Sequence, residues 1–191
     1  MAPQTILVVG ATGKLGTGAI KALLNSPEYP QYPGYPARFH VLALTRKDRS
    51  TRAKDLREAV PFGTMSFIEG DSTNPQPIFD SEPRGSITGL FLSTTLGADV
   101  SEEQQAIPLI NAAVKHGVKH IVFSSVDRGG DERSWTNPTT IKHFRAKHNI
   151  EIYLRDKAEK YNGKFTWTIL RPVAFLDNMT PGIMCSLFTA V

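Results

Sequence analysis

The sequence predicts an α/β protein with a doubly wound, six-stranded parallel sheet. Short apolar runs alternate with segments of helical periodicity along most of the 191 residues. This alternation is typical of parallel strands that are covered by helices on both faces. A glycine-punctuated turn, Gly10 to Gly16, joins the first apolar run to the first helical segment. In such sheets a ligand binds outside the carboxyl ends of the strands.

Ten segments make up the predicted elements. The strands are expected at residues 5–9, 39–44, 65–69, 89–93, 120–124 and 166–170. The helices are expected at residues 14–25, 50–58, 101–116 and 138–161. In the third helix Ala106, Leu109, Ile110 and Ala113 share one apolar face, and Gly117 is a plausible C-terminal stop.

The first turn, Gly10-Ala11-Thr12-Gly13-Lys14-Leu15-Gly16, has the features of a pyrophosphate site. The first glycine allows a tight turn, the second lets backbone N–H groups approach a phosphate, and the third lets the helix pack close to the strand. The helix N-terminus adds partial positive charge and free N–H donors. The spacing G-x-x-G-x-x-G differs from the commoner G-x-G-x-x-G, but it lies in the required strand–turn–helix context. The predicted cofactor contacts here are Gly10, Thr12, Gly13, Lys14, Leu15 and Gly16.

The residues that follow the second strand favour NADP(H) over NAD(H). Arg46 is the first charged residue past this strand, and Lys47 lies beside it. A basic residue at this point suits a ribose 2′-phosphate, whereas a carboxylate suits a free hydroxyl. The planar guanidinium offers paired donors to phosphate, and Thr45 adds a hydroxyl. Asp48 is a competing candidate to bind the ribose. The alternative interpretation of Arg46 is a solvent-exposed loop charge with no role in binding.

Polar residues also follow the third and fourth strands. Asp71 and Ser72 are candidates to contact the adenine, because a carboxylate here can accept from the amino group. A simple turn with a capping aspartate is equally compatible with these residues. Thr94, in the stretch after the fourth strand, is expected near the inner ribose or the nicotinamide.

Several motifs in their order along the chain resemble the NmrA-like group of atypical short-chain dehydrogenases/reductases. They are the glycine turn, Leu44-Thr45-Arg46, Gly70-Asp71, the segment Gly117 to Val126, and Leu170-Arg171-Pro172. The resemblance implies a Rossmann fold and a preference for NADP(H). The group includes reductases of small aromatic or secondary-metabolite substrates. It also includes redox-sensing regulators that bind the dinucleotide and control a transcription factor by contact.

The resemblance also implies a catalytic Tyr-x-x-x-Lys helix and a serine on the preceding strand. Here His143 stands where the tyrosine is expected, Lys147 follows at i+4 on the same helix face, and Ser125 follows the fifth strand. These three residues are the candidate catalytic groups, and Lys147 is also expected to hold the nicotinamide ribose. Histidine titrates near neutral pH, but its ring is shorter than that of tyrosine and a nearby lysine disfavours its charged form. A standard short-chain dehydrogenase reaction is therefore not expected.

Composition indicates which class of binding partner and which cellular compartment to expect. The net charge of +4 comes from scattered basic residues, which favours a phosphate-bearing small ligand over direct nucleic-acid binding. The sequence has no run of about 18 apolar residues, so no membrane span is predicted. No metal site is expected. The single cysteine, Cys185, excludes an internal disulfide and favours a reducing compartment. The expected location is the cytoplasm, with the nucleus left open as well.

The sequence predicts two regions. Residues 1–172 form the dinucleotide-binding domain, and residues 173–191 are a short apolar remnant of a substrate lobe that is otherwise largely absent. Three Tyr-Pro repeats at residues 29–37 predict a surface insertion or, alternatively, a ridge that binds a partner.

The sequence is compatible with two functions. The first is an NADP(H)-binding redox sensor or regulator with little or no catalysis, which acts through a protein partner such as a transcription factor. The alternative is an NADP-dependent oxidoreductase that reduces a small carbonyl or enone substrate. The oligomeric state is left open.

Overall fold

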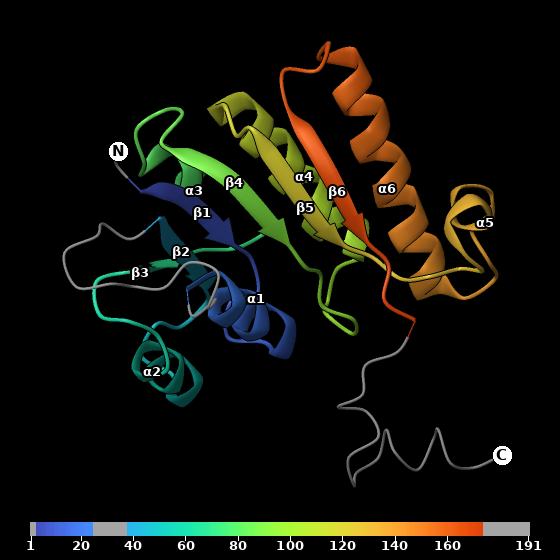
Figure 1. Ribbon diagram of the computed structural model, residues 1–191. Helices are drawn as coiled ribbons and strands as arrows, with labels where there is room; N and C mark the ends of the chain where they lie inside the picture. The colour runs from blue at the N-terminus through green and yellow to red at the C-terminus, as the bar shows by residue number, and fades with distance from the viewer. Residues whose placement is uncertain (1–2, 25–37, 174–191) are drawn as a thin grey trace, which may run out of the picture.

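A computed structural model describes residues 3–24 and 38–173, which form an α/β sandwich around one parallel sheet (Figure 1). The sheet has six strands in the order β3-β2-β1-β4-β5-β6, and every neighbouring pair is parallel. The strands are β1 (Gln4–Val8), β2 (Phe39–Thr45), β3 (Met65–Glu69), β4 (Ile87–Leu92), β5 (His120–Ser124) and β6 (Thr166–Leu170). This order is that of a Rossmann fold, so the predicted fold class is confirmed.

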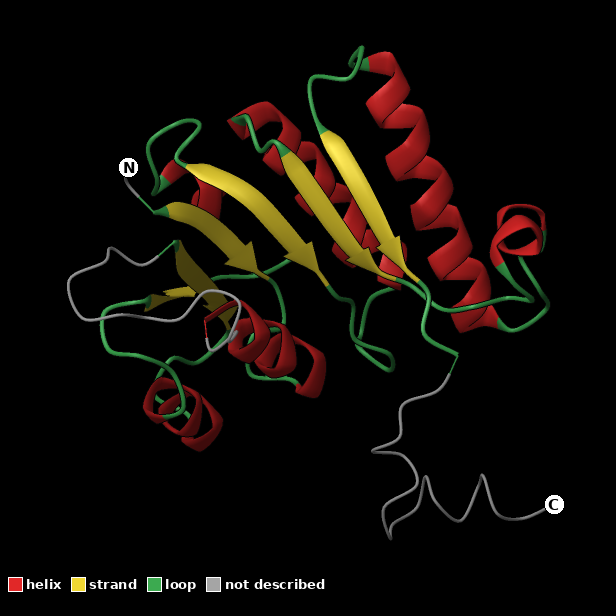
Figure 2. Ribbon diagram, in the orientation of Figure 1, coloured by secondary structure: helices red, strands yellow, loops and turns green. Residues whose placement is uncertain are grey.

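Helices cover both faces of the sheet (Figure 2). They are α1 (Lys14–Leu24), α2 (Thr51–Glu58), α3 (Gln76–Asp80), α4 (Glu102–His116), α5 (Asp131–Thr136) and α6 (Lys142–Lys160). On one face Ile20, Leu24 and Leu56 pack from α1 and α2 against β1 and β2. On the other face α3, α4 and α6 supply the larger apolar cluster, which includes Leu109 and Leu154.

The direction of the chain reverses between β1 and β4. From β1 the chain first moves outward through β2 and β3, and it then crosses back to β4 and moves outward through β5 and β6. The loops after β1 and β4 therefore lead away from each other at the carboxyl edge of the sheet. In open α/β sheets this reversal point is where ligands bind.

The observed elements differ from the predicted ones mainly around β4 and between β5 and α6. The helices α3 and α5 were not predicted, and α6 begins at Lys142 rather than at residue 138. The later start has a local cause, because Thr139 has a left-handed φ of 59° and its N–H donates to the side chain of Asn137 (3.2 Å). The predicted segments at residues 29–37 and 174–191 lie outside the described residues.

Among the helices of residues 3–24 and 38–173, none combines the length and the apolar character needed to cross a membrane.

Candidate functional site

The turn between β1 and α1 has a geometry that depends on glycine. Gly10 has a φ of 69°, and its carbonyl accepts the N–H of Gly13 (2.9 Å). A Cβ on Gly16 would clash with the Gly10 carbonyl and would lie 2.8 Å from the Cα of Ala11. The hydroxyl of Thr17 donates to the Ala11 carbonyl (3.0 Å) and ties the helix to the turn. Close packing of α1 on the turn therefore requires glycine at position 16.

This turn leaves backbone donors open to solvent. The N–H groups of Lys14, Leu15 and Gly16 have no acceptor among the described residues, and Lys14 and Leu15 are exposed. Free N–H groups and the positive end of the helix dipole make such a helix start an anion site. The predicted residues of the turn therefore fit the pyrophosphate of a dinucleotide.

The residues after β2 form a mixed-charge edge. The hydroxyl of Thr45 accepts the N–H of Lys47 (3.2 Å), and the side chains of Arg46 and Lys47 are exposed. A hollow of about 460 Å³ adjoins them and is lined by Lys47, Asp48, Arg49, Ser50 and Glu69. Two cations and two carboxylates line this hollow. Because the carboxylates repel a phosphate, it can bind only on the side where the basic side chains face it.

The carboxylate of Asp71 forms hydrogen bonds within its own turn. It accepts the N–H (2.8 Å) and the hydroxyl (2.9 Å) of Thr73. These two hydrogen bonds, with a small contribution from Arg46, hold the pKa of Asp71 below its usual value. The carboxylate is exposed and has further acceptor capacity, whereas Ser72 is half-buried beside it.

The ammonium of Lys147 lies close to the carboxyl ends of β4 and β5. It donates to the hydroxyl of Thr94 (2.6 Å) and to the carbonyl of Ser124 (2.8 Å), and it forms an ion pair with Glu102 (3.4 Å). An ammonium has three N–H donors, and the two hydrogen bonds use two of them. Burial lowers the pKa of Lys147, and the neighbouring Glu102 carboxylate opposes this shift.

Glu102 is the group at this site that the sequence did not reveal. It opens α4, which is held at its start by a capping box between Ser101 and Gln104, and it is 5% exposed. Its carboxylate accepts the hydroxyl of Thr94 (2.5 Å) and is also hydrogen-bonded to the His143 ring. His143 and Glu102 are 41 residues apart in sequence, so no local spacing rule could have paired them.

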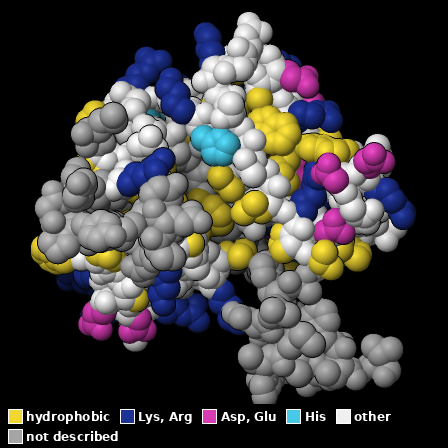
Figure 3. Space-filling view, viewed as in Figure 1, with side chains coloured by type: hydrophobic (Ala, Val, Ile, Leu, Met, Phe, Trp, Pro, Cys, Tyr) yellow, Lys and Arg dark blue, Asp and Glu magenta, His cyan; other side chains and the backbone are white. Residues whose placement is uncertain are grey.

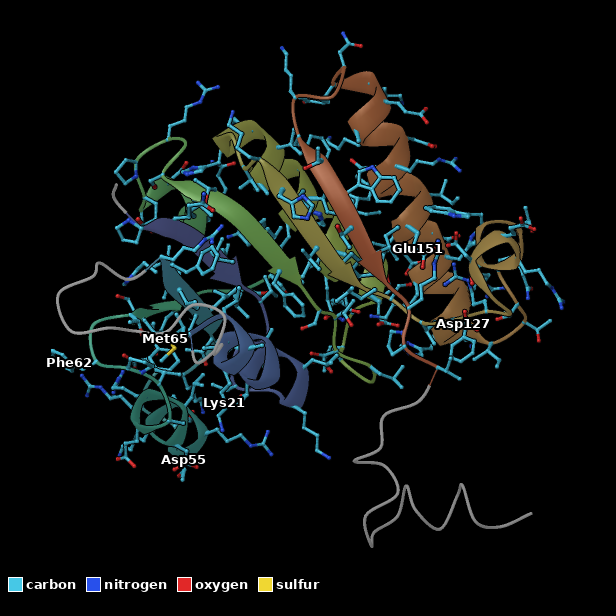
Figure 4. All side chains as sticks on the ribbon, viewed as in Figure 1. Lys21, Asp55, Phe62, Met65, Asp127 and Glu151 are labelled. Carbon is cyan, nitrogen blue, oxygen red and sulfur yellow. The ribbon has the colours of Figure 1, made fainter. Side chains whose placement is uncertain are left out.

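Ser125 faces a different set of partners. Its hydroxyl donates to Glu151, which is also paired with Arg128 (2.7 Å) and Arg171 (2.9 Å). Figure 4 shows Glu151 projecting from α6 toward the end of β6. Burial alone would raise the pKa of Glu151, but the hydrogen bonds from Arg128, Arg171 and Ser125 outweigh it and lower the pKa.

Arg171, part of the Leu-Arg-Pro motif, has a structural role in this network. It pairs with Glu151 and with Asp131 of α5, and its guanidinium stacks over the Trp135 ring at 4.4 Å. It thereby fixes α5 against the carboxyl end of the sheet. The segment between β5 and α6 is held in this way.

The structure thus brings three predicted residues, Thr94, His143 and Lys147, together around Glu102. It directs the fourth, Ser125, away from them toward Glu151. Among residues 3–24 and 38–173, no group of three His, Cys, Asp or Glu side chains is placed to hold a metal ion.

Solved structures of related fold include several dinucleotide complexes. An NADPH-dependent quinone oxidoreductase from Escherichia coli, complexed with NADPH, has a TM-score of 0.65 at 21% identity over 98% of this chain and 53% of that chain. NmrA, a negative transcriptional regulator, solved in complex with NADP, has a TM-score of 0.60 at 22% identity over 88% and 45%. A UDP-glucose 4-epimerase from Bifidobacterium longum, solved with NAD+ and UDP, has a TM-score of 0.62 at 19% identity over 88% and 52%. At these identities the likeness shows the fold.

Sequence comparison gives the family. The NmrA-like family domain-containing oxidoreductase ptmS from Penicillium ochrochloron is 26% identical over 160 residues, which is 80% of this chain and 42% of the relative. The chain spans less than half the length of the curated relatives it matches. The profile of the NmrA-like family matches residues 2–187, and the chain therefore belongs to that family.

Proposed function

We propose that this protein is an NADP(H)-binding regulator that carries out little or no hydride transfer. The observation that carries the proposal is the internal engagement of the polar groups at the site. Lys147 donates two hydrogen bonds to protein atoms and is paired with Glu102, His143 is bonded to Glu102, and the Ser125 hydroxyl donates to Glu151. A group that polarises or protonates a substrate has to be free to reach it.

Support for a bound dinucleotide comes from the turn before α1. Its free N–H groups and its glycine packing fit a pyrophosphate, and the carboxyl edge at the β1/β4 reversal is the usual place for one. The similarity to a quinone oxidoreductase solved with NADPH and to NmrA solved with NADP is consistent with this assignment.

Support for the phosphorylated dinucleotide comes from Arg46 and Lys47. Both side chains are exposed at the end of β2, and no ion pair within the described residues involves either of them. They are therefore available to a 2′-phosphate. Lys147 would contact the nicotinamide ribose by exchanging its longest contact, the 3.4 Å ion pair with Glu102.

A regulator transmits its bound state to another molecule. The proposed partner is a protein such as a transcription factor, by analogy with NmrA, which is described as a negative transcriptional regulator. The partner and its binding surface on this chain are part of the proposal.

Calorimetric titration of the full chain with NADPH and with NADH tests the cofactor. We expect NADPH to bind tighter by roughly tenfold or more, because each charge-assisted contact contributes about 1.5–3 kcal/mol. The double variant Arg46→Ala/Lys47→Ala should lose this preference and keep its affinity for NADH. Lys54→Ala, which removes an exposed cation on α2, is the matched control and should bind as the unmodified chain does. Equal affinity for the two cofactors in the unmodified chain would contradict the proposal.

The second candidate is an NADP-dependent oxidoreductase acting on a small carbonyl or enone. It is favoured by one observation, the His143 ring hydrogen-bonded to Glu102 one helical turn from Lys147. A carboxylate that orients a histidine is a common arrangement for proton transfer. The bound cofactor supplies the hydride, and His143 would hold the proton destined for the substrate oxygen.

Turnover assays separate the two candidates. NADPH oxidation is followed with a panel of quinones, aldehydes and enones for the unmodified chain and for His143→Ala. We expect no oxidation above the rate without protein in either case. Turnover that disappears in His143→Ala while NADPH affinity is retained would favour the oxidoreductase.

A further inference from the structure

A second hollow lies at the opposite edge of the sheet from the dinucleotide site. It has a volume of about 370 Å³ and is formed where α4 and α6 end and where β4, β5 and β6 begin. Its lining consists of Arg84, Val114, Lys115, Gly117, Val118, Lys119, Tyr161, Lys164 and Phe165. Figure 3 shows dark-blue side chains along the upper rim of the molecule, where Figure 1 places the starts of these strands.

The charge of this hollow is one-sided. Four cations, Arg84, Lys115, Lys119 and Lys164, line it, and no carboxylate does so among the described residues. None of the four side chains has a hydrogen bond or an ion pair with another described residue. The hollow beside β2, in contrast, balances two cations with two carboxylates. Clustered like charges raise one another's energy, so an unpaired cluster favours an anionic partner.

Helix dipoles explain only part of this cluster. Lys115 lies in the last turn of α4, where a cation offsets the negative end of the dipole. Arg84, Lys119 and Lys164 lie outside the helices, each a few residues before the strand that follows. Gly117 ends α4 with a φ of 104°, and a Cβ there would lie 3.6 Å from Gly85, so the loop bearing Arg84 packs directly on this helix end.

The same helix ends argue against a small, deeply seated anion. Both α4 and α6 present their carboxyl ends here, with caps at Gly117 and Tyr161. Backbone carbonyls repel an anion, and no helix N-terminus offers N–H donors in their place. Long Lys and Arg side chains place their charges at the rim instead. The rim therefore suits an anion that extends over the hollow.

The spacing of the strands gives the size of that anion. Neighbouring strands lie about 4.8 Å apart, so the starts of β4, β5 and β6 span about 10 Å, which is about three residues of an extended chain. Tyr161 is 40% exposed and adds an aromatic surface at the same place. One exposed ring is too little for a stacking platform for bases. We infer that this rim is a docking surface for an extended acidic segment of a protein partner.

Fluorescence anisotropy with a labelled hexaglutamate peptide tests this docking surface on the full chain. At about 10 mM ionic strength, where the Debye length is about 30 Å, we expect saturable binding that weakens strongly at about 150 mM. The variant Lys115→Glu/Lys119→Glu should lose affinity by roughly tenfold or more, because like charges then face each other. Its affinity for NADPH should be unchanged, since the two sites lie at opposite edges, and this also shows that the variant is folded.

The matched control is Lys21→Glu/Lys54→Glu, which changes the net charge by the same amount on α1 and α2. Figure 4 labels Lys21 on α1, which covers the part of the sheet remote from the hollow. This control should change peptide affinity by less than about twofold. Equal losses in both double variants would show general surface charge only and would overturn the inference.

Two competitors complete the test. Unlabelled hexaglutamate should displace the probe, and tripolyphosphate at equal total charge should displace it poorly. Tripolyphosphate that competes equally well would assign a small-anion site, and a labelled oligothymidylate that binds tighter and is lost in the same variant would assign a nucleic-acid site. Either result would overturn the acidic-peptide surface.

Discussion

The carboxylate of Glu102 contacts three side chains that come from two other parts of the chain. Thr94 follows β4, Glu102 opens α4, and His143 and Lys147 lie one turn apart on α6. Because Lys147 is only 5% exposed, its charge depends on this carboxylate for compensation. A single side chain therefore provides the nearest compensation for the buried charge of Lys147.

Glu102→Gln keeps the size of the side chain and removes this compensation. We expect the free energy of unfolding near pH 7 to fall by about 2–4 kcal/mol. The pKa of Lys147 is already lowered by burial and should fall further in the variant. A lowered pKa means that the folded state releases the proton more readily than the unfolded state does. The deficit should therefore shrink as the pH rises toward about 10, where the lysine becomes neutral.

Urea denaturation of the variant over this pH range measures the effect. Glu103→Gln is the matched control, because Glu103 is the next residue and accepts a hydrogen bond from Asn149 at the surface (3.1 Å). It should leave stability nearly unchanged. A deficit in Glu102→Gln that is independent of pH would show that charge compensation of Lys147 is not its cause.

Ser125→Ala tests whether this serine is structural or catalytic. The hydroxyl donates to the buried Glu151, so the variant should lose about 1 kcal/mol of stability and keep its affinity for NADPH. Thermal unfolding and calorimetric titration measure the two quantities. Unchanged stability together with a loss of turnover would instead place Ser125 at a substrate.

At the scale of single elements, α1 carries two glycines with opposite roles. A Cβ on Gly16 would clash with the Gly10 carbonyl, whereas a Cβ on Gly18 would meet nothing within 4 Å. We expect Gly16→Ala to destabilise the fold by about 2 kcal/mol or more and to abolish NADPH binding, because α1 must move away from the turn. Gly18→Ala should stabilise the helix by about 0.5–1 kcal/mol and leave binding intact. Equal effects of the two variants on binding would contradict the assignment of the turn.

The elements that could be predicted are those with long, regular patterns. Apolar runs gave the bounds of β3, β5 and β6 as the structure has them, and the alternation of strands and helices gave the parallel sheet. The helices α3 and α5 have five and six residues, which is too short for helical periodicity to be recognised. The start of α6 depends on the turn at Thr139, which no propensity in the sequence indicated.

The site was predictable to a similar degree and for similar reasons. Spacing identified the glycine turn and placed His143 and Lys147 on one helix face. The contact that both side chains make with Glu102 agrees with this placement. Contacts between distant residues, such as Glu102 with His143 or Ser125 with Glu151, depend on the packing of α4 and α6. Sequence separation carries no information about such pairs in a single chain.

At the scale of the whole molecule, the sheet separates two edges of different character. The carboxyl edge carries the glycine turn, the basic residues after β2 and the Lys147 cluster, and these lie on both sides of the reversal between β1 and β4. The opposite edge carries the unpaired cations around Tyr161. A ligand that crosses the reversal at the carboxyl edge would therefore contact both halves of the sheet.

A ligand that bridges both halves should stabilise the molecule as one unit. With free NADPH at about one hundred times its Kd, linkage predicts about 2.7 kcal/mol of added stability. For a domain of this size that corresponds to a rise in Tm of roughly 5–10 °C. Differential scanning fluorimetry measures the rise, and Lys115→Glu/Lys119→Glu should show it in full, because its substitutions lie at the other edge. Gly16→Ala should show none, and a Tm of the unmodified chain that does not respond to NADPH would contradict dinucleotide binding at this edge.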